Sequence, residues 1–143
     1  MRVSPSLTDQ IELRYSLLTL AAVAVIYVLS SMPDLSAERD PLLQLAWNLA
    51  HIPAFGTLAF LMLKAISGTE RVSWDRCGIA LVGSAAYAVA DEWHQSFVPG
   101  RYASVGDFVL DLAGIAGTLL IVRLTGFGMR DADTTSPQRM TRA

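Results

Sequence analysis

The sequence contains little charge, two histidines and a single cysteine. Of its 143 residues, 17% are charged and 52% are hydrophobic, and the mean hydropathy is +0.41. A chain of this size with this composition is too apolar for an ordinary soluble domain. The lone Cys77 excludes an internal disulfide and does not indicate a redox compartment. HExxH and comparable zinc-binding patterns are absent, and we expect no nucleic-acid partner.

Four apolar stretches account for most of the chain. They cover residues 15–32, 47–66, 77–97 and 104–124. A hydrocarbon core about 30 Å thick requires roughly 20 helical residues, and each stretch approaches or reaches that length. A soluble helix would alternate polar and apolar faces, whereas residues 79–90 offer only Gly83 and Ser84 as breaks. We therefore predict an all-α polytopic membrane protein with four transmembrane helices in a bundle.

The positive charges are distributed unevenly between the two sides of this bundle. Cytoplasmic segments of membrane proteins retain Lys and Arg. If both ends of the chain and the middle connector share a side, that side holds Arg2, Arg14, Lys64, Arg71, Arg76, Arg123, Arg130, Arg139 and Arg142. The opposite side holds only Arg39 and Arg101. We therefore predict a cytoplasmic segment over 1–14, a transmembrane domain over 15–124 and a polar, disordered cytoplasmic tail over 125–143.

The acidic residues, the histidines and Gln95 that interrupt the apolar stretches all fall at the extracytoplasmic end of this topology, together with Asp34. Asp34 follows the first stretch, and the others lie near the start of the second, the end of the third and the start of the fourth. Charges inside a bilayer are costly, so they tend to pair, face inward and mark function. With one basic residue from the last connector, the candidate ligand-binding or polar-network residues are His51, Asp91, Glu92, His94, Gln95, Arg101, Asp107 and Asp111.

Residue spacing places some of these side chains on common helix faces. Asp91 and His94 are three residues apart, and Asp107 and Asp111 are four apart, so each pair shares a face. Gly114 continues the face of the second pair. Ala113 and Gly117 form a small-xxx-small pair beside it. We therefore predict that Gly114 and Gly117 allow the fourth helix to pack closely on a neighbour.

A tight turn joins the third and fourth stretches. Pro99 and Gly100 supply the turn geometry, and Arg101 follows them. We expect the turn to bring the Arg101 guanidinium back over the carboxylates. There it can bind Asp107 or Glu92 bidentately, or hold a phosphate or carboxylate of a ligand.

These residues together resemble the signature of the VanZ-like membrane proteins. That family typically has a D-E-x-x-Q stretch, a P-G-R turn, two acidic or amide residues four apart and a G-xx-G helix, and an upstream His followed by an aromatic residue. The matching positions are His51, Phe55, 91–101, Ser104, Asp107, Asp111, Gly114 and Gly117. The resemblance covers roughly residues 47–124. Trp47 and Asn48 stand where the family often has Asp and Lys, and Phe55 replaces the usual Tyr, so roles that need a Lys or a phenol are not expected here.

The resemblance implies a multi-pass protein of the bacterial cytoplasmic membrane, in the group named for teicoplanin resistance, and it implies no reaction. The function that we favour is a non-enzymatic envelope protein. It would bind a glycopeptide, a lipid, a cell-wall precursor or a partner protein through the extracytoplasmic polar site. No complete catalytic constellation can be assembled from the residues, and no cofactor is required. Oligomerisation is left open.

Three alternatives use the same residues. A membrane-embedded hydrolase could act on a lipid-linked substrate. It could use a divalent metal such as zinc or manganese to activate water, or work without metal, with Glu92 or Asp91 as general acid or base. Its candidate metal ligands are His51, Asp91, His94, Asp107 and Asp111. A purely structural network of acids and Arg101 could fasten the third and fourth helices. An ion transporter is the weakest, because four short helices leave little room for alternating access.

Overall fold

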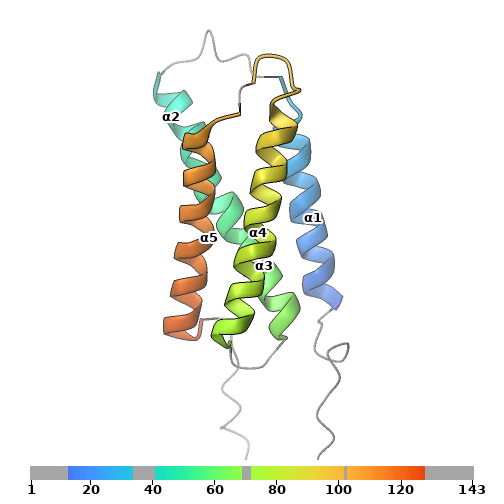
Figure 1. Cartoon of the computed structure of the whole chain (residues 1–143), viewed down its shortest axis with the longest axis vertical. Helices are drawn as coiled ribbons and strands as arrows, with labels where there is room; N and C mark the ends of the chain where they lie inside the picture. Colours follow the sequence, from blue (N-terminus) through green and yellow to red (C-terminus); the bar gives the residue numbers. More distant parts are fainter. Residues whose placement is uncertain (1–12, 34–40, 69–71, 102, 128–143) are drawn as a thin grey trace, which may run out of the picture.

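The computed structural model describes residues 13–33, 41–68, 72–101 and 103–127, and in these ranges all regular structure is helical (Figure 1). The prediction of an all-α chain is confirmed. The helices are α1 (Leu13–Ser30), α2 (Pro41–Leu49), α3 (His51–Ser67), α4 (Trp74–Gln95) and α5 (Val105–Thr125). Asp34, most of the segment 1–14 and most of the tail 125–143 lie outside the described residues.

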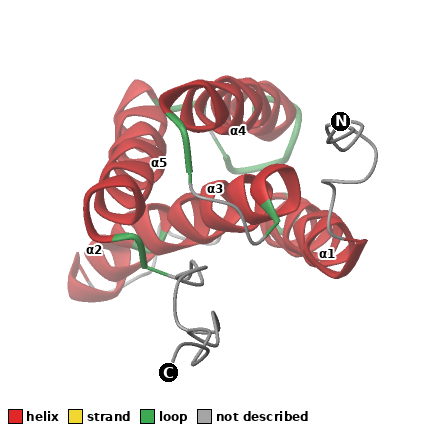
Figure 2. Ribbon diagram, turned by 90° about the horizontal axis from the view of Figure 1, so that it is seen from below, coloured by secondary structure: helices red, strands yellow, loops and turns green. Residues whose placement is uncertain are grey.

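α3 occupies the centre of the bundle and packs against α1, α4 and α5 (Figure 2). Its inward side chains Leu58, Ala59 and Leu63 are fully buried. The outer faces of the surrounding helices remain apolar, for example at Leu20 of α1 and Val109 of α5, which are 64% and 56% exposed. Large exposed apolar faces on helices of this length are expected where lipid rather than water surrounds the protein.

Three helical segments are long and apolar enough to cross a membrane: α1, the joined segment Pro41–Ser67 and α5. Three segments of this length and composition are those of a membrane protein. α4 has 22 residues, which is enough length, but it is not among the three. Its last turns carry Asp91, Glu92 and His94, which lower its mean hydropathy. By composition, the described residues therefore contain one apolar span fewer than the four that we predicted.

The predicted second stretch is divided into α2 and α3. Pro53 has no N–H to donate to the Leu49 carbonyl, and its ring crowds that oxygen, so the regular helix ends there. The chain bends without unwinding, because Ala50 N still donates to Ala46 O (3.0 Å) and Ala54 N to Ala50 O (3.2 Å). The bend directs α2 away from the bundle axis (Figure 1).

α3 and α5 touch through their backbones. A Cβ on Gly114 would overlap the backbone oxygen of Ile52, and a Cβ on Gly56 would lie 2.6 Å from Thr118 Oγ1. Glycine at both positions therefore permits the close approach. Gly114 lies at the contact that the sequence suggests, whereas for Gly117 no described atom of a neighbouring element lies within 4 Å of a Cβ position. The partner on α3 is Gly56, which sequence spacing alone did not identify.

Candidate functional site

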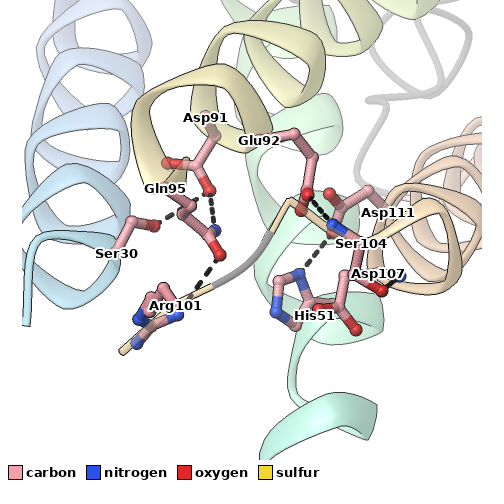
Figure 3. A network of polar contacts seen from close by, with 9 residues as sticks. All are labelled: Ser30, His51, Asp91, Glu92, Gln95, Arg101, Ser104, Asp107 and Asp111. Atoms are coloured by element: carbon pink, nitrogen blue, oxygen red, sulfur yellow. Dashed lines mark hydrogen bonds and ion pairs between the residues drawn. The ribbon is translucent and has the colours of Figure 1, made fainter. Parts of the chain in front are cut away.

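α1 and α4 finish, and α3 and α5 begin, at the same end of the bundle (Figure 1). Polar side chains from these helices bond to one another there, and we call it the polar end. The helices alternate in direction, so residues far apart in the sequence meet here. The side chains form two hydrogen-bonded groups (Figure 3). One joins α1, α4 and the α4–α5 turn, and the other joins α3, α4 and α5.

Asp91 is the acceptor at the centre of the first group. Ser30 Oγ donates to Asp91 Oδ2 (2.9 Å), and Gln95 Nε2 donates to the same oxygen (2.8 Å). All three residues are buried. A buried carboxylate is costly unless it is hydrogen-bonded, so these two donors stabilise Asp91 and tie the last residue of α1 to α4.

Arg101 departs from the prediction. Its Nε donates to Met32 O (3.0 Å), its Nη2 to Leu29 O (3.1 Å) and its Nη1 to Gln95 Oε1 (3.4 Å). Within the described part of the chain it pairs with no carboxylate, so of the two roles considered for it, the bidentate contact with Glu92 or Asp107 is not observed. The physical reason is the end of α1, whose last carbonyls lack helical partners and carry partial negative charge.

His94 also faces α1. Its Nε2 lies 2.9 Å from Ser31 Oγ, and its ring centroid lies 4.7 Å from that of Tyr27. Asp91 and His94 thus share a helix face, as their spacing indicates, and that face is turned toward α1. Neither side chain contributes to the second group.

His51 and Asp111 form the core of the second group. His51 Nδ1 lies 2.8 Å from Asp111 Oδ1, the Asp111 side chain is fully buried, and the His51 side chain is 18% exposed. The His51 ring is parallel to that of Phe55, with centroids 6.3 Å apart. In Figure 3 the second ring nitrogen of His51 points away from Asp111, toward the side where Arg101 lies. Asp111 therefore orients an imidazole whose free edge faces the interior of the polar end.

Glu92 and Asp107 hold the beginning of α5. The Ser104 backbone N–H donates to Glu92 Oε2 (2.6 Å), and Asp107 N donates to Ser104 Oγ (3.2 Å), which makes Ser104 the N-cap. Asp107 sits in the first turn, where a carboxylate favours the helix dipole. The spacing Ser104-x-x-Asp107 is a capping pattern that could have identified this helix start from sequence.

A cavity of about 80 Å³ opens between the end of α1, the α2–α3 junction and α4. Its polar wall consists of Ser30, His51, Asp91 and Arg101. Its apolar wall consists of Ile26, Leu29, Trp47, Ala50, Ala54 and Phe55. A water molecule occupies roughly 30 Å³ of liquid, so the space suits a few waters or one small chemical group. Sequence analysis gave no indication that Ser30 and Trp47 line this site.

A second, larger space lies on another face of α3. This groove of about 390 Å³ runs between α3 and α5 from Ile52 to Phe127, and its polar contributions come from Thr57 and Thr118. It contains no ionisable side chain. We therefore take the smaller cavity, where four polar side chains converge, as the candidate site.

The candidate metal ligands do not converge. Asp91 and His94 belong to the first group, whereas His51 and Asp111 belong to the second. In the part of the chain that the structure describes, no group of three or more His, Cys, Asp or Glu side chains is arranged to hold a metal ion. The geometry of the described residues therefore does not support these candidate metal ligands as one site.

Comparison with known proteins identifies a family. The sequence model of the family described as VanZ/LLP1 matches residues 2–126, which include every candidate site residue. No curated protein and no solved structure matches the chain significantly. The match agrees with the resemblance that residues 91–101 and the following acidic pair carry.

Proposed function

We propose, from the premise that this chain belongs to the VanZ-like family, that it binds the anionic head group of a lipid or lipid-linked cell-wall precursor. The observation that carries the proposal is the cavity at the polar end, which joins a guanidinium and an imidazole to an apolar wall. A ligand with a charged head and an apolar chain matches both walls. Binding would take place at the outer face of the bacterial cytoplasmic membrane.

The proposal requires the chain to cross the membrane four times, with both termini in the cytoplasm. α3 and α5 both run away from the polar end (Figure 1). If both span the bilayer in this direction, α4 must cross back between them, and its 22 residues reach about 33 Å. The uneven distribution of Lys and Arg supports an outward polar end. Reporter fusions at Gly68 and Pro99 test this topology, with cytoplasmic and external signals expected respectively; the reverse pattern would place the site inside.

The size of the cavity restricts the ligand. Drug-sized molecules occupy pockets of roughly 300–1,000 Å³, whereas this cavity measures about 80 Å³. A head group fits, and a whole glycopeptide does not. Tolerance to teicoplanin, where this protein confers it, would therefore act through a lipid or precursor and not through capture of the antibiotic.

The charges in the cavity favour an anion. Arg101 contributes a permanent positive charge, and its present partners are neutral backbone and amide oxygens that a stronger anionic acceptor could displace. Asp91 also lines the cavity, but Ser30 and Gln95 already donate to its carboxylate. The group of the polar wall that can attract an anion is therefore the Arg101 guanidinium.

Trp47 reports on the cavity directly. In protein with Trp74→Phe and Trp93→Phe, Trp47 is the remaining tryptophan. We expect brominated phosphatidylglycerol or a long-chain prenyl phosphate to quench its fluorescence saturably in nanodiscs of phosphatidylcholine. Ala54→Leu places a larger side chain in the cavity wall and should abolish saturable quenching. Ala24→Leu makes the same change on an exposed face of α1 and serves as the matched control.

Quenching that never saturates, or that survives Ala54→Leu unchanged, would contradict the proposal. Brominated phosphatidylglycerol should quench the protein that keeps Arg101 but not Arg101→Gln, whereas neutral brominated lipid should quench the two proteins equally. This result would show that the guanidinium recognises the head group. These measurements do not depend on any reaction.

A hydrolase that acts without metal is the second candidate, because Asp111 orients His51 as a general base. Its nucleophile would be water, since Ser30 Oγ donates to Asp91 and Ser104 Oγ caps α5. Mass spectrometry of lipids after incubation with protein tests this candidate. Turnover that His51→Gln abolishes while Trp47 quenching persists would establish it.

A further inference from the structure

An acid and a base line the candidate cavity side by side. Asp91 and Arg101 both belong to its wall, and in the described structure no ion pair joins them. The amide of Gln95 lies between them: its Nε2 donates to Asp91 Oδ2 (2.8 Å), and its Oε1 accepts from Arg101 Nη1 (3.4 Å) (Figure 3). Because one amide group separates the two charges, a single small group in the cavity can reach both.

Asp91 presents a hydrogen-bond acceptor to such a group. Ser30 Oγ and Gln95 Nε2 both donate to Oδ2. In Figure 3 the other carboxylate oxygen, Oδ1, has no bond to any residue drawn. A carboxylate oxygen accepts hydrogen bonds and repels other negatively charged oxygens. A ligand that fills the cavity is therefore favoured if it brings a proton that it can donate to Asp91.

His51 adds a second acceptor when its ring is neutral. Asp111 Oδ1 lies 2.8 Å from His51 Nδ1, and a carboxylate at this position keeps the ring proton on Nδ1. The opposite nitrogen, Nε2, then has a free lone pair. Asp91, His51 and Arg101 are the ionisable side chains that line the cavity, and the other lining residues from α1, α2 and α3 carry no ionisable group.

A phosphate monoester matches this combination of one strong donor and two acceptors. Its monoanion accepts from a guanidinium through its phosphoryl oxygens and donates through its remaining P–OH group, whereas a phosphate diester has no such proton. A monoester also ends at its phosphate, and a cavity of about 80 Å³ leaves little room for a second substituent.

We propose that the cavity selects a lipid phosphate monoester over a diester. Arg101 donates to the phosphoryl oxygens, and Asp91 Oδ1 accepts from the P–OH group without taking its proton. A diester is still attracted by Arg101 but has nothing to donate to Asp91, so it binds more weakly. Because this inference names the class of head group for the same cavity, it rests on the proposed function.

Two lipids with identical brominated acyl chains test the selection. Phosphatidic acid is a monoester and phosphatidylglycerol is a diester. Each is titrated in phosphatidylcholine nanodiscs against the protein in which Trp47 is the remaining tryptophan. We expect phosphatidic acid to half-saturate the quenching at a mole fraction about tenfold lower, which corresponds to about 1.4 kcal/mol.

The preference should also depend on pH. The second ionisation of a phosphate monoester has a pKa of about 6, so the P–OH group is common at about pH 6 and scarce at about pH 8. The ratio of the two affinities should therefore fall by about tenfold across this range. The ratio is the useful measure, since a change in the charge of His51 acts on both lipids.

Asp91→Asn separates recognition from folding. The amide oxygen can still accept from Ser30 and Gln95, while the NH₂ group replaces Oδ1 and turns an acceptor into a donor. Phosphatidic acid should then bind about tenfold more weakly, and phosphatidylglycerol equally or more tightly. A loss of structure would weaken both lipids together. Asp75→Asn is the matched control, because it makes the same change in the first turn of the same helix.

The outcomes distinguish this inference from the proposed function. Equal affinities for the two anionic lipids would overturn the inference and leave the proposed function intact, whereas the absence of saturable quenching by either lipid would remove both. Equally tight binding of brominated phosphatidylethanolamine, whose ammonium group can donate to Asp91, would overturn the assignment to a monoester. Displacement of phosphatidic acid by millimolar inorganic phosphate would overturn the assignment to a lipid.

Discussion

The two ends of the bundle differ in the sign and length of their charged side chains and in the partners that these side chains have. At the polar end, short carboxylates are buried and depend on donors from neighbouring helices. At the opposite end, long cationic side chains lie over aromatic rings: Lys64 Nζ is 5.3 Å from the Tyr15 ring centroid, and Arg123 is 4.9 Å from that of Trp74. Lys64 also donates to Gly68 O (3.0 Å) at the end of α3.

The difference follows from side-chain length. A Lys or Arg side chain is long enough to reach the end of its own helix, as Lys64 does at Gly68 although it is only 3% exposed. Asp and Glu are too short to do so from within a helix, so their partners must be built into the protein. The opposite end can therefore serve as an anchor whose contacts act one by one. The polar end works as a unit, and a change in one member should affect the others.

The largest effect is expected where backbone contact fixes the polar end. Gly114→Ala should destabilise the protein by about 3 kcal/mol, because the new Cβ meets the Ile52 backbone, which cannot rotate away. His51 adjoins Ile52, so the change also separates His51 from Asp111. Unfolding in mixed micelles measures the loss.

Gly117→Ala is the matched control for this prediction. It lies in the same helix, and its Cβ position has no described neighbour within 4 Å. We expect it to be neutral or to stabilise the protein by up to about 1 kcal/mol. Equal losses at both glycines would show that α5 does not approach α3 as the structure indicates.

The next effect concerns the buried acid. Asp111→Ala should cost about 2 kcal/mol, because it leaves His51 without its partner in a buried site. Asp107→Ala, one turn earlier on α5, should cost less than about 1 kcal/mol, since its side chain contributes chiefly to the helix dipole. Similar losses for both, measured by unfolding, would mean that burial does not distinguish the two acids.

The sequence was sufficient for the features that depend on local composition. Apolar length predicted the helices, and the intruding polar residues correctly pointed to one end of the bundle. It was insufficient where partners depend on how helices rotate against one another. Spacing placed Asp91 and His94 on one face of α4 but could not show that this face turns to α1.

Two other differences have separate causes. Arg101 finds backbone carbonyls, which every residue carries and no side-chain pattern reveals. The break between α2 and α3 could have been anticipated, because Pro53 removes a helical hydrogen bond at a known position. The small residue Gly114 on α5 indicated a close contact with a neighbouring helix. Its partner Gly56 could be identified only from the way in which α3 and α5 cross.

A smaller effect is expected at the turn. Arg101→Lys keeps the charge but cannot donate to Leu29 O, Met32 O and Gln95 together, and should cost about 1 kcal/mol. Arg101→Gln should cost about the same, because all three present acceptors are uncharged oxygens. A clearly milder loss for the lysine variant would show that positive charge, not the fork of donors, holds the turn to α1.

The smallest effect belongs to the opposite end, where a double-mutant cycle isolates one contact. Trp74→Leu and Arg123→Gln should show a coupling of about 0.5 kcal/mol, because Trp74 is 60% exposed and the cation lies over its ring. The same cycle at His51 and Asp111 should give a larger coupling, since that pair is hydrogen-bonded and buried. If the aromatic contact couples as strongly as the buried pair, the opposite end is not a set of independent anchors, and the two ends of the bundle hold their charges by equally cooperative means.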